Sequence, residues 1–491
     1  MKYLKNKNMT MLTDFYELTM SQAYFNQGMQ DTIVYFDLFF RRVPDGGGYA
    51  IMAGLEQAID YIENLHFDQE DIEFLRSTRN FTEDFLNYLA DFSFACDVWA
   101  IQEGTPIFQG EPILKVRGPI IQAQMIETML LLTINHQSLI ATKSSRIVNQ
   151  AQGRSVMEFG ARRAQGSDAS VLGARAAYIG GVDSTSCTLA GEVFGIPLSG
   201  TMAHSFVQLY ENEYEAFKSY AESYPDNTVL LIDTYNVLES GLPNAIRVAK
   251  EVLIPQGKRL KGVRLDSGDI TYLSVECRRI LDEAGLDDCK IVVSNSLDEH
   301  IIREVLIQGA KIDAFGVGER LITSKSEPVF GGVYKLSAVE SADGTVNPRM
   351  KVSESVSKIT NPGSKSLYRF IDKKTGKAVA DLITLEEEYI NPDHPYELFD
   401  PEATWKRQTV RDYELVELLV PVFEGGKLVY DLPTIEEIRA HSKEQMKTLW
   451  PSVTRLENPH IYYVDLSQRL WELKHQILRD MQSYTHKGYT E

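Results

Sequence analysis

The residues best suited to chemistry in this sequence stand where apolar runs end. Residues 198–206 read Leu-Ser-Gly-Thr-Met-Ala-His-Ser-Phe, so Thr201 and His204 follow an apolar run that includes Phe194 and Pro197. This pattern is typical of a buried strand that ends at a site and is followed by a helix. His204 is therefore the candidate chemical centre; the alternative is a histidine that simply packs at the start of the helix.

A second group of chemically capable residues lies in segment 264–269, which reads Arg-Leu-Asp-Ser-Gly-Asp. Arg264 carries a planar guanidinium that can bind a carboxylate or a phosphate through two donors. Asp266 and Asp269 could accept hydrogen bonds from the hydroxyls of a sugar or hold Mg²⁺ through water. The same residue types also cap helices and form turns, so this motif indicates a site only if it follows a barrel strand.

An aromatic residue followed by two cations forms a third motif, Phe-Gly-Ala-Arg-Arg at residues 159–163. A planar heteroaromatic ligand could stack on Phe159, while Arg162 or Arg163 could neutralise its charge. In isolation the same residues would also suit a core phenylalanine beside surface arginines.

Three segments could bind phosphate groups. Gly316 and Gly318 stand at the end of a predicted strand and would let backbone N–H groups approach a phosphate, with Thr323 as a hydroxyl donor. Arg41 is one of two adjacent arginines beside a glycine-rich loop, and Lys351 lies in a loop rich in lysine and serine. The alternative for Arg41 and for Lys351 is a solvated surface position.

An alternation of strands and helices between residues 153 and 339 would position these groups. Apolar strands separated by amphipathic helices indicate a parallel sheet, either a barrel or a doubly wound sheet. The predicted strands are 156–159, 198–202, 229–233, 262–265, 290–293, 314–317 and 332–336.

The ends of these strands favour the barrel. Polar residues follow nearly every strand, and in a closed barrel all of these ends meet on one face, where barrel enzymes keep their chemistry. In an open sheet they would be spread along a line, with one crevice at the switch point. The sequence thus predicts an α/β protein with an irregular (β/α) barrel of about seven strands over residues 151–340.

The segments on either side of the barrel predict an additional α+β domain. Residues 1–150 contain a predicted strand at 33–40 and short antiparallel strands between residues 97 and 122. Residues 341–491 contain two predicted hairpins and a helix that begins at Thr434 with the pattern of a capping box. We expect this C-terminal segment to pack back on the N-terminal domain.

The composition excludes several classes of function. The chain has 491 residues and a formal net charge of −19, which argues against non-specific nucleic-acid binding because that needs a basic field. Its four cysteines lack metal-ligand spacing, and scattered thiols fit a reducing cytosol. No signal peptide is found, and no stretch is apolar for long enough to span a membrane. We expect a cytoplasmic enzyme that binds neither nucleic acid nor membrane.

The motifs also exclude some enzyme mechanisms. No lysine stands at a predicted strand end to form a Schiff base, and no Walker A or Gly-x-Gly-x-x-Gly motif follows a strand. Cations, a glycine-rich loop, acidic residues and one histidine at the mouth of a barrel are suited instead to a phosphorylated sugar.

Taken in order, the motifs resemble those of the nicotinate phosphoribosyltransferase family. The resemblance runs from near residue 10 to about residue 370, and region 97–150 is also similar to the N-terminal domain of the related quinolinate enzyme. The motifs that carry it are Thr13-Asp-Phe-Tyr-Glu17, Phe159-Gly-Ala-Arg-Arg163, Gly181-Val-Asp-Ser184, Gly200-Thr-Met-Ala-His-Ser205, Val263-Arg-Leu-Asp-Ser-Gly-Asp269 and Phe315-Gly-Val-Gly318.

The resemblance implies a transfer of phosphoribosyl from 5-phosphoribosyl 1-pyrophosphate to nicotinate, which yields nicotinate mononucleotide and pyrophosphate in NAD salvage. It implies that ATP hydrolysis is coupled to this transfer through phosphorylation of His204, in a ligase-type reaction. It also implies that Mg²⁺ arrives with the substrate pyrophosphate, with Asp269 as a candidate protein ligand. Finally, it implies a homodimer whose subunits share their active sites.

The resemblance, together with the motifs described above, implies a role for each candidate residue. His204, Arg264 and Asp266 are the expected catalytic residues. Tyr16, from the second subunit, and Phe159 would enclose the pyridine ring. The remaining expected contacts are Arg264 and Thr201 to the nicotinate carboxylate, Asp266 to the ribose, Arg162 and Asp183 to the substrate near the ring, Gly316, Gly318 and Thr323 to the 5′-phosphate, and Arg41 and Lys351 to the pyrophosphate.

Two other functions stay open at this point. The first is a nicotinamide phosphoribosyltransferase: Ala203 before His204 favours the nicotinate enzyme, whereas Asp183 would suit an amide better than a carboxylate. The second is a barrel lyase or isomerase that acts on a sugar phosphate, with His204 as a general acid and base and no need for ATP.

Overall fold

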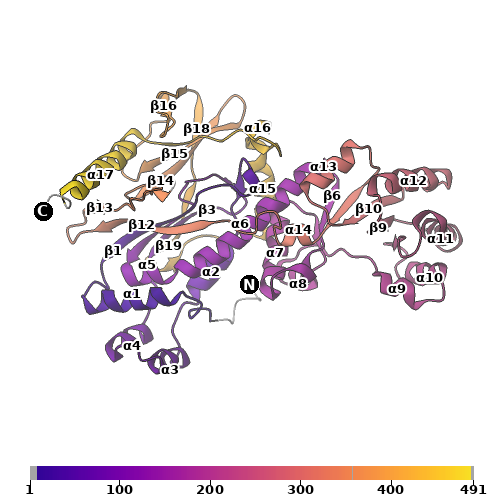
Figure 1. Cartoon of the computed structure of the whole chain (residues 1–491), viewed down its shortest axis with the longest axis horizontal. Helices are drawn as coiled ribbons and strands as arrows, with labels where there is room; N and C mark the ends of the chain where they lie inside the picture. The colour runs from indigo at the N-terminus through magenta and orange to yellow at the C-terminus, as the bar shows by residue number, and fades with distance from the viewer. Residues whose placement is uncertain (1–7, 356–357, 488–491) are drawn as a thin grey trace. The chain divides into compact units, whose positions relative to one another are not determined.

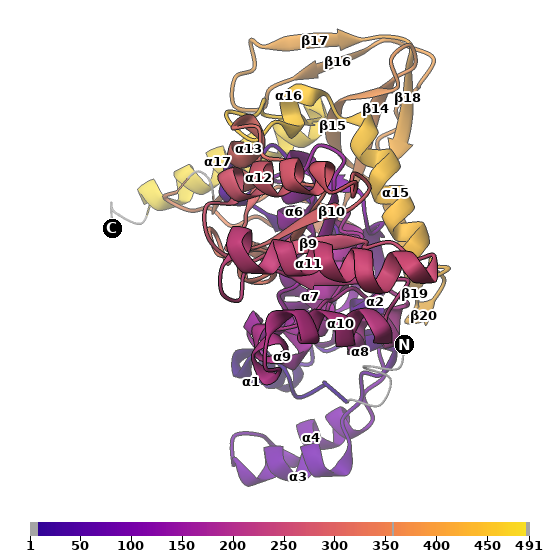
Figure 2. The same ribbon diagram turned by 90° about the vertical axis from the view of Figure 1, so that its right-hand side faces the viewer.

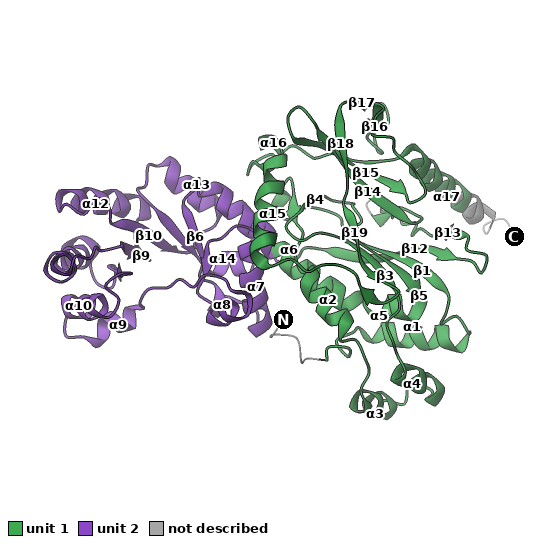
Figure 3. Ribbon diagram, turned by 180° about the vertical axis from the view of Figure 1, so that it is seen from behind, with its two compact units in different colours: residues 1–139, 329–491 green, residues 140–328 purple. Residues whose placement is uncertain are grey.

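The computed structural model of the chain describes residues 8–355 and 358–487, which divide into two units (Figures 1 and 3). Unit 1 comprises residues 1–139 and 329–491, and unit 2 comprises residues 140–328. The boundaries expected from the sequence, at residues 150 and 340, both lie later in the chain. The long helix α6 (Glu127–Gln150) begins in unit 1 and ends in unit 2.

Unit 2, which is described throughout, is built on a six-stranded sheet in which every pairing is parallel. The strands are β6 (Ser155–Glu158), β7 (Ser184–Thr185), β8 (Val229–Leu231), β9 (Gly262–Leu265), β10 (Lys290–Asn295) and β11 (Ala314–Val317). Their order in the sheet is β7-β6-β11-β10-β9-β8. The last strand thus returns to lie beside the first, as in a barrel, but no ladder joins the edge strands β7 and β8. The sheet is therefore a half-barrel.

The predicted strand at residues 198–202 is wrong. Only a single parallel bridge forms there, between Leu198 and Thr185. The Leu198 side chain is 55% exposed and Gly200 follows it closely, so the segment lacks the buried, branched side chains that stabilise a ladder. Sequence reasoning also missed β7, because Ser184 and Thr185 carry no apolar pattern.

The predicted strand at residues 332–336 is confirmed as a strand, but its assignment to the barrel is wrong. This segment begins β12 (Gly332–Glu340), which pairs antiparallel with β1 (Ile33–Phe40) in unit 1. Its Tyr334 ring stacks on Phe36 with the ring centroids 4.6 Å apart, and the Tyr334 hydroxyl donates to the Ala123 carbonyl at 2.8 Å. The apolar pattern of this strand therefore serves the core of unit 1.

The helices of unit 2 begin where polar residues can cap them. Asn212, Asp269 and Asp298 each accept a hydrogen bond from a backbone N–H in the first turn of α10, α12 and α13 respectively. Figure 2 shows α9, α10 and α11 lying side by side. The helices are α7 (Ser167–Ile179), α8 (Thr188–Phe194), α9 (His204–Leu209), α10 (Glu213–Ser223), α11 (Leu242–Val248), α12 (Ile270–Glu283), α13 (Glu299–Ile307) and α14 (Glu319–Ile322).

Unit 1 contains a seven-stranded antiparallel sheet of order β13-β12-β1-β5-β3-β19-β20 and a four-stranded sheet of order β18-β14-β15-β21. The C-terminal strand β19 pairs with β3, so segments far apart in the sequence share one sheet. The other strands are β2 (Ala50–Ile51), β3 (Asp97–Ile101), β4 (Pro106–Ile107), β5 (Leu114–Pro119), β13 (Val346–Pro348), β14 (Lys365–Asp372), β15 (Lys377–Leu385), β16 (Tyr396–Phe399), β17 (Arg407–Val410), β18 (Tyr413–Glu417), β19 (Leu419–Glu424), β20 (Lys427–Leu428) and β21 (Val464–Leu466).

The predicted capping box is confirmed at the start of α15, where the Thr434 side chain accepts from the Glu437 N–H and the Glu437 side chain accepts from the Thr434 N–H. None of the described helices is long and apolar enough to cross a membrane. The helices of unit 1, apart from α6, are α1 (Phe15–Asn26), α2 (Leu55–Glu63), α3 (Gln69–Ser77), α4 (Glu83–Ala90), α5 (Ile120–Met125), α15 (Ile435–Thr448), α16 (Pro451–Thr454) and α17 (Gln468–Lys487).

Candidate active site

The carboxyl ends of β9 and β10 bring Arg264, Asp266 and Ser294 together. The register pairs Leu265 with Val293, so Asp266 and Ser294 are the next residues of two adjacent strands. Arg264 donates through Nε to Ser294 Oγ at 2.9 Å and through Nη2 to Asp266 Oδ1 at 3.1 Å, and Ser294 also donates to Asp266. The sequence motif therefore becomes a hydrogen-bonded cluster.

Thr201 completes the ring of acceptors around Arg264. The guanidinium donates through Nη1 to Thr201 Oγ1 at 2.7 Å and to the Met202 carbonyl at 3.4 Å. With the bonds to Ser294 and Asp266, these contacts use four of the five N–H groups of arginine. The Arg264 side chain is only 15% exposed. These hydrogen bonds fix the plane of the guanidinium group. Among the described contacts, one Nη2–H has no acceptor.

His204 is the first residue of α9 and keeps 41% of its side chain exposed. Its Nδ1 lies 3.1 Å from Thr234 Oγ1, and its Nε2 lies 3.9 Å from Asp266 Oδ2. Thr234 follows β8, so two loops hold the ring from different sides. His204 is not a histidine packed in a core, and the Thr234 contact leaves Nε2 as the nitrogen that can meet a ligand.

Asp266 is held in its ionised form. Partial burial by itself would raise the pKa of Asp266, but the hydrogen bond from Ser294 and the charge of Arg264 outweigh it and lower the pKa below its usual value. The Asp266 N–H also donates to Asp233 Oδ2 at 3.1 Å, and Ser267 donates to the same oxygen at 2.6 Å. The site therefore offers a fixed anion next to a fixed cation.

Phe159 lies against the backbone of β11 beside this cluster. Its N–H donates to the Val317 carbonyl at 2.8 Å, and its ring centroid is 5.9 Å from Arg264 Cζ. A Cβ at Gly316 would lie 2.5 Å from the ring, so only glycine leaves room for it there. A Cβ at Gly318 would come within 3.1 Å of the Phe159 carbonyl oxygen. Both glycines predicted to bind phosphate thus also make room for Phe159.

Other predicted residues of unit 2 are placed differently. Asp183 accepts from Ser155 Oγ at 2.8 Å and from the Val156 N–H at 3.1 Å, which is the amino end of β6 and not the edge that carries Arg264. Asp269 caps α12 by accepting from the Tyr272 N–H at 3.0 Å. The structure therefore does not bring Asp183 or Asp269 into the cluster.

Two more predicted residues, Arg162 and Thr323, make no described contact with the cluster. The Thr323 hydroxyl donates to the Glu319 carbonyl at 2.7 Å at the end of α14, so this contact occupies its only O–H. Arg162 is exposed on the short helical turn that follows β6. Neither residue contacts Arg264 or Asp266 through a described hydrogen bond.

Three predicted residues belong to unit 1. Tyr16 is 44% exposed on α1, and burial of its hydroxyl, followed by the charge of Glu127, raises its pKa. Arg41 Cζ lies 5.8 Å from the Phe39 ring centroid, and its Nε is buried with no hydrogen-bond partner among the described residues. Lys351 is exposed, and its N–H donates to Thr360 Oγ1 at 3.2 Å.

Sequence reasoning left Thr234, Ser294 and Glu158 without a role. Thr234 and Ser294 each stand at a strand end, which is the only signal that the sequence offers for them. Glu158 is fully buried, and it accepts from Thr185 Oγ1 at 2.6 Å and from the Gly160 N–H. Burial raises the pKa of Glu158 despite these bonds. This carboxyl group supports the loop that carries Phe159.

No metal site is built from side chains alone in the described part of the chain. No group of three or more histidine, cysteine, aspartate or glutamate side chains there could hold an ion. Asp269, a candidate ligand, accepts through Oδ1 from the Tyr272 N–H as the cap of α12.

Known proteins are similar to this chain over nearly its full length. Family models described as the nicotinate phosphoribosyltransferase N-terminal domain and C-terminal domain match residues 11–135 and 364–474. The nicotinate phosphoribosyltransferase of Bacillus subtilis (strain 168) is 43% identical over 481 residues, which cover 98% of this chain and 97% of that one. The human nicotinate phosphoribosyltransferase is 33% identical, with 95% and 96% covered. A crystal structure of human nicotinic acid phosphoribosyltransferase aligns with a TM-score of 0.84 at 31% identity, covering 94% of this chain and 99% of that one.

Proposed function

The chain belongs to the nicotinate phosphoribosyltransferase family, and we propose that it transfers phosphoribosyl from 5-phosphoribosyl 1-pyrophosphate to nicotinate in NAD salvage. The products are nicotinate mononucleotide and pyrophosphate. The observation that carries the proposal is the cluster of Arg264, Asp266 and Phe159, because a fixed cation beside an aromatic ring suits a flat acid and a nearby carboxylate suits ribose hydroxyls.

The transfer needs placement more than proton chemistry. The bond between ribose C1 and the pyrophosphate oxygen breaks as the pyridine nitrogen forms its bond to C1, so positive charge develops on the sugar. Phe159 would stack on the pyridine ring, Arg264 with Thr201 would bind the carboxylate, and Asp266 would hold the ribose next to the developing charge. Positioning and charge neutralisation would supply most of the rate.

His204 would couple ATP to this transfer. The γ-phosphoryl group of ATP would pass to Nε2, giving ADP and phosphohistidine, and water would later release phosphate. Accepting a phosphoryl group requires a neutral ring with a lone pair on Nε2. The contact with Thr234 supports this role, since a hydroxyl that accepts from Nδ1–H leaves the lone pair on Nε2.

Magnesium and a second subunit complete the proposal. Mg²⁺ would be carried by the pyrophosphate of the substrate, because proteins usually hold this ion through one or two carboxylates together with substrate phosphates. We infer a cytoplasmic homodimer in which Tyr16 of one subunit closes the site of the other. The free, buried state of all four cysteines fits a reducing compartment.

One assay separates the candidate reactions. Nicotinate, nicotinamide or quinolinate is offered with phosphoribosyl pyrophosphate, Mg²⁺ and ATP, and mononucleotide and ADP are quantified. We expect mononucleotide from nicotinate, with ADP formation. Product from nicotinamide but not from nicotinate would overturn the proposal. His204→Ala should abolish phosphoprotein formation and the stimulation by ATP while leaving the fold intact; retained ATP coupling would exclude His204 from that role.

A further inference from the structure

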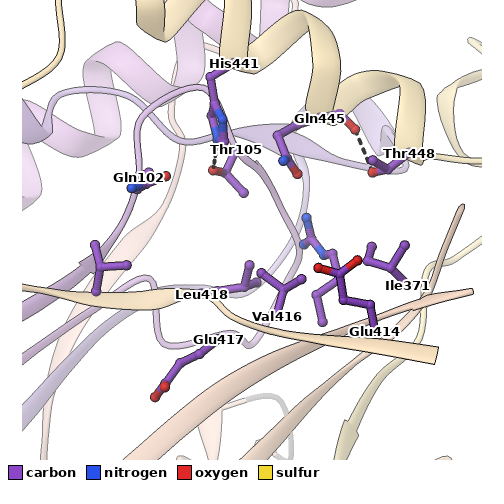
Figure 4. A pocket seen from close by; sticks show the side chains of 12 residues that line it. Gln102, Thr105, Ile371, Glu414, Val416, Glu417, Leu418, His441, Gln445 and Thr448 are labelled. Atoms are coloured by element: carbon purple, nitrogen blue, oxygen red, sulfur yellow. Dashed lines mark hydrogen bonds between the residues drawn. The ribbon is translucent and has the colours of Figure 1, made fainter. Parts of the chain in front are cut away.

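A cavity of about 270 Å³ lies in unit 1 between strands β14 and β18 on one side and helix α15 on the other (Figure 4). All of the residues that line it belong to unit 1, and none of them has a role in the proposed transfer. Its walls combine apolar side chains with a few polar groups, which is the composition of sites for small molecules.

The strand side of the cavity is one face of the four-stranded sheet. The register pairs Arg369 with Val416 and Ile371 with Glu414. Because side chains alternate along a strand, these four residues point to the same face. The intervening Phe370 belongs to the hydrophobic core on the other face. The cavity therefore lies against the face of the four-stranded sheet that is opposite this core.

The helix side of the cavity presents polar groups at helical spacing. His441, Gln445 and Thr448 of α15 are four and three residues apart and share one face of the helix. Figure 4 shows all three above Val416, and His441 Nε2 lies 3.0 Å from Thr105 Oγ1. The Gln445 carboxamide has no hydrogen-bond partner among the described residues. It can both donate to a ligand and accept from one.

Among the residues that line the cavity, Arg369 is buried, with only 1% of its surface exposed. Its Nε and Nη2 donate to Asp381 at 2.8 and 2.6 Å, and Nη2 also donates to the Pro106 carbonyl at 2.9 Å. Its Nη1 is buried with no hydrogen-bond partner in the described part of the chain, and the guanidinium carbon lies 5.3 Å from the Phe108 ring centroid. Buried unpaired donors are rare in native proteins and call for an explanation, and Asp381 holds this donor rigidly in place.

The charges around the cavity select against an anion. Asp381 already neutralises Arg369, and the acidic side chain that shares the cavity face of the sheet with Arg369 is that of Glu414. Burial lowers the pKa of His441, which disfavours the charged form of its ring. An acid or a phosphate would meet net negative charge here, whereas an uncharged ligand would not.

We propose that this cavity binds a small uncharged aromatic amide. The amide carbonyl would accept from Arg369 Nη1, its N–H groups would donate to Gln445 or Glu414, and the ring would lie on Val416. No covalent step is involved. The inference does not rest on the proposed transfer reaction, because no residue is shared with it.

Calorimetric titration with benzamide, and with benzoate as its charged counterpart, tests the proposal on the full chain. We expect benzamide to bind and benzoate to bind at least fivefold more weakly. Gln445→Leu removes one hydrogen bond and should weaken benzamide binding about fivefold. Val416→Trp fills the cavity and should abolish binding. Gln476→Leu, a matched change at an exposed position of α17, should bind as the wild type does.

The Arg264→Ala variant tests whether benzamide binds at the transfer site and not in the cavity of unit 1. Unchanged benzamide binding in this variant supports the cavity, and loss of binding there overturns the proposal. No binding to the wild type, equal binding of benzoate, or full binding by both Gln445→Leu and Val416→Trp would each overturn it as well. Circular dichroism verifies that each variant is folded, and a benzamide soak of wild-type crystals should place density against Arg369.

Discussion

Replacing Gly316 by alanine tests whether the Phe159 ring positions the substrate. A Cβ at residue 316 would lie 2.5 Å from Phe159 Cδ2 and 2.6 Å from Cε2, and 3.3 Å from Ser294 Cβ. Non-bonded carbon atoms keep about 3.5 to 4.0 Å apart. The ring must therefore move by about 1 Å to admit the methyl group.

A shift of this size should lower activity far more than stability. Misplacing a positioning group by about 1 Å can cost about 100-fold in rate, whereas overpacking a site costs about 1–3 kcal/mol of unfolding free energy. We expect kcat/KM for nicotinate to fall about 100-fold in Gly316→Ala while the chain stays folded. Initial rates at varied nicotinate, with the other substrates saturating, measure the first quantity, and urea denaturation measures the second.

Gly200→Ala is the matched control. A Cβ at Gly200 meets no atom within 4 Å, so its kcat/KM should stay within about twofold of the wild type. Wild-type activity in Gly316→Ala would refute the reasoning, because the ring would then have no positioning role. An equal loss in both glycine variants would refute it too, since crowding of Phe159 could not be the cause.

Three further predictions concern single side chains. Thr234→Val removes the hydroxyl beside His204 Nδ1, so phosphorylation of His204 by labelled ATP should slow about fivefold; an unchanged rate excludes this role. Burial raises the pKa of Glu17 from 4.5 to about 7, so the folded state holds its proton longer and wild-type stability should fall as pH rises between these values. The urea midpoint of Glu17→Gln should therefore change less with pH across this range than that of the wild type. Equal pH dependence of the two midpoints would contradict a raised pKa of Glu17. Arg369→Met leaves buried Asp381 without its counter-charge, so urea denaturation should show a loss of about 3–5 kcal/mol; a loss below about 1 kcal/mol contradicts it.

Local patterns predicted the elements whose causes are local. The strand at residues 33–40 is confirmed with those bounds, because a run of eight mostly aromatic and branched residues suits only a buried strand there. The start of α15 at Thr434 is confirmed for a similar reason, since a capping box is closed within one turn of helix. The order of the motifs also predicted the family, which the comparisons confirm.

The cluster around Arg264 was predictable in part. Arg264 and Asp266 stand at the end of β9 as predicted, whereas Thr201 and His204 reach the cluster from a loop and from the start of α9, not from the end of a strand. Thr234 was not given a role, because a hydroxyl at a strand end has no signature until its partner is known.

Only the tertiary structure decided which segments meet. The pattern at residues 332–336 reads as a strand in either unit, and its pairing with β1 depends on a partner about 300 residues away. The structure turns Asp183 to the start of β6, and it places Gly316 against Phe159. The sequence alone determined residue types, local periodicity and helix caps, which act over a few residues. Register and side-chain approach arise from packing between distant segments, and no local pattern encodes them.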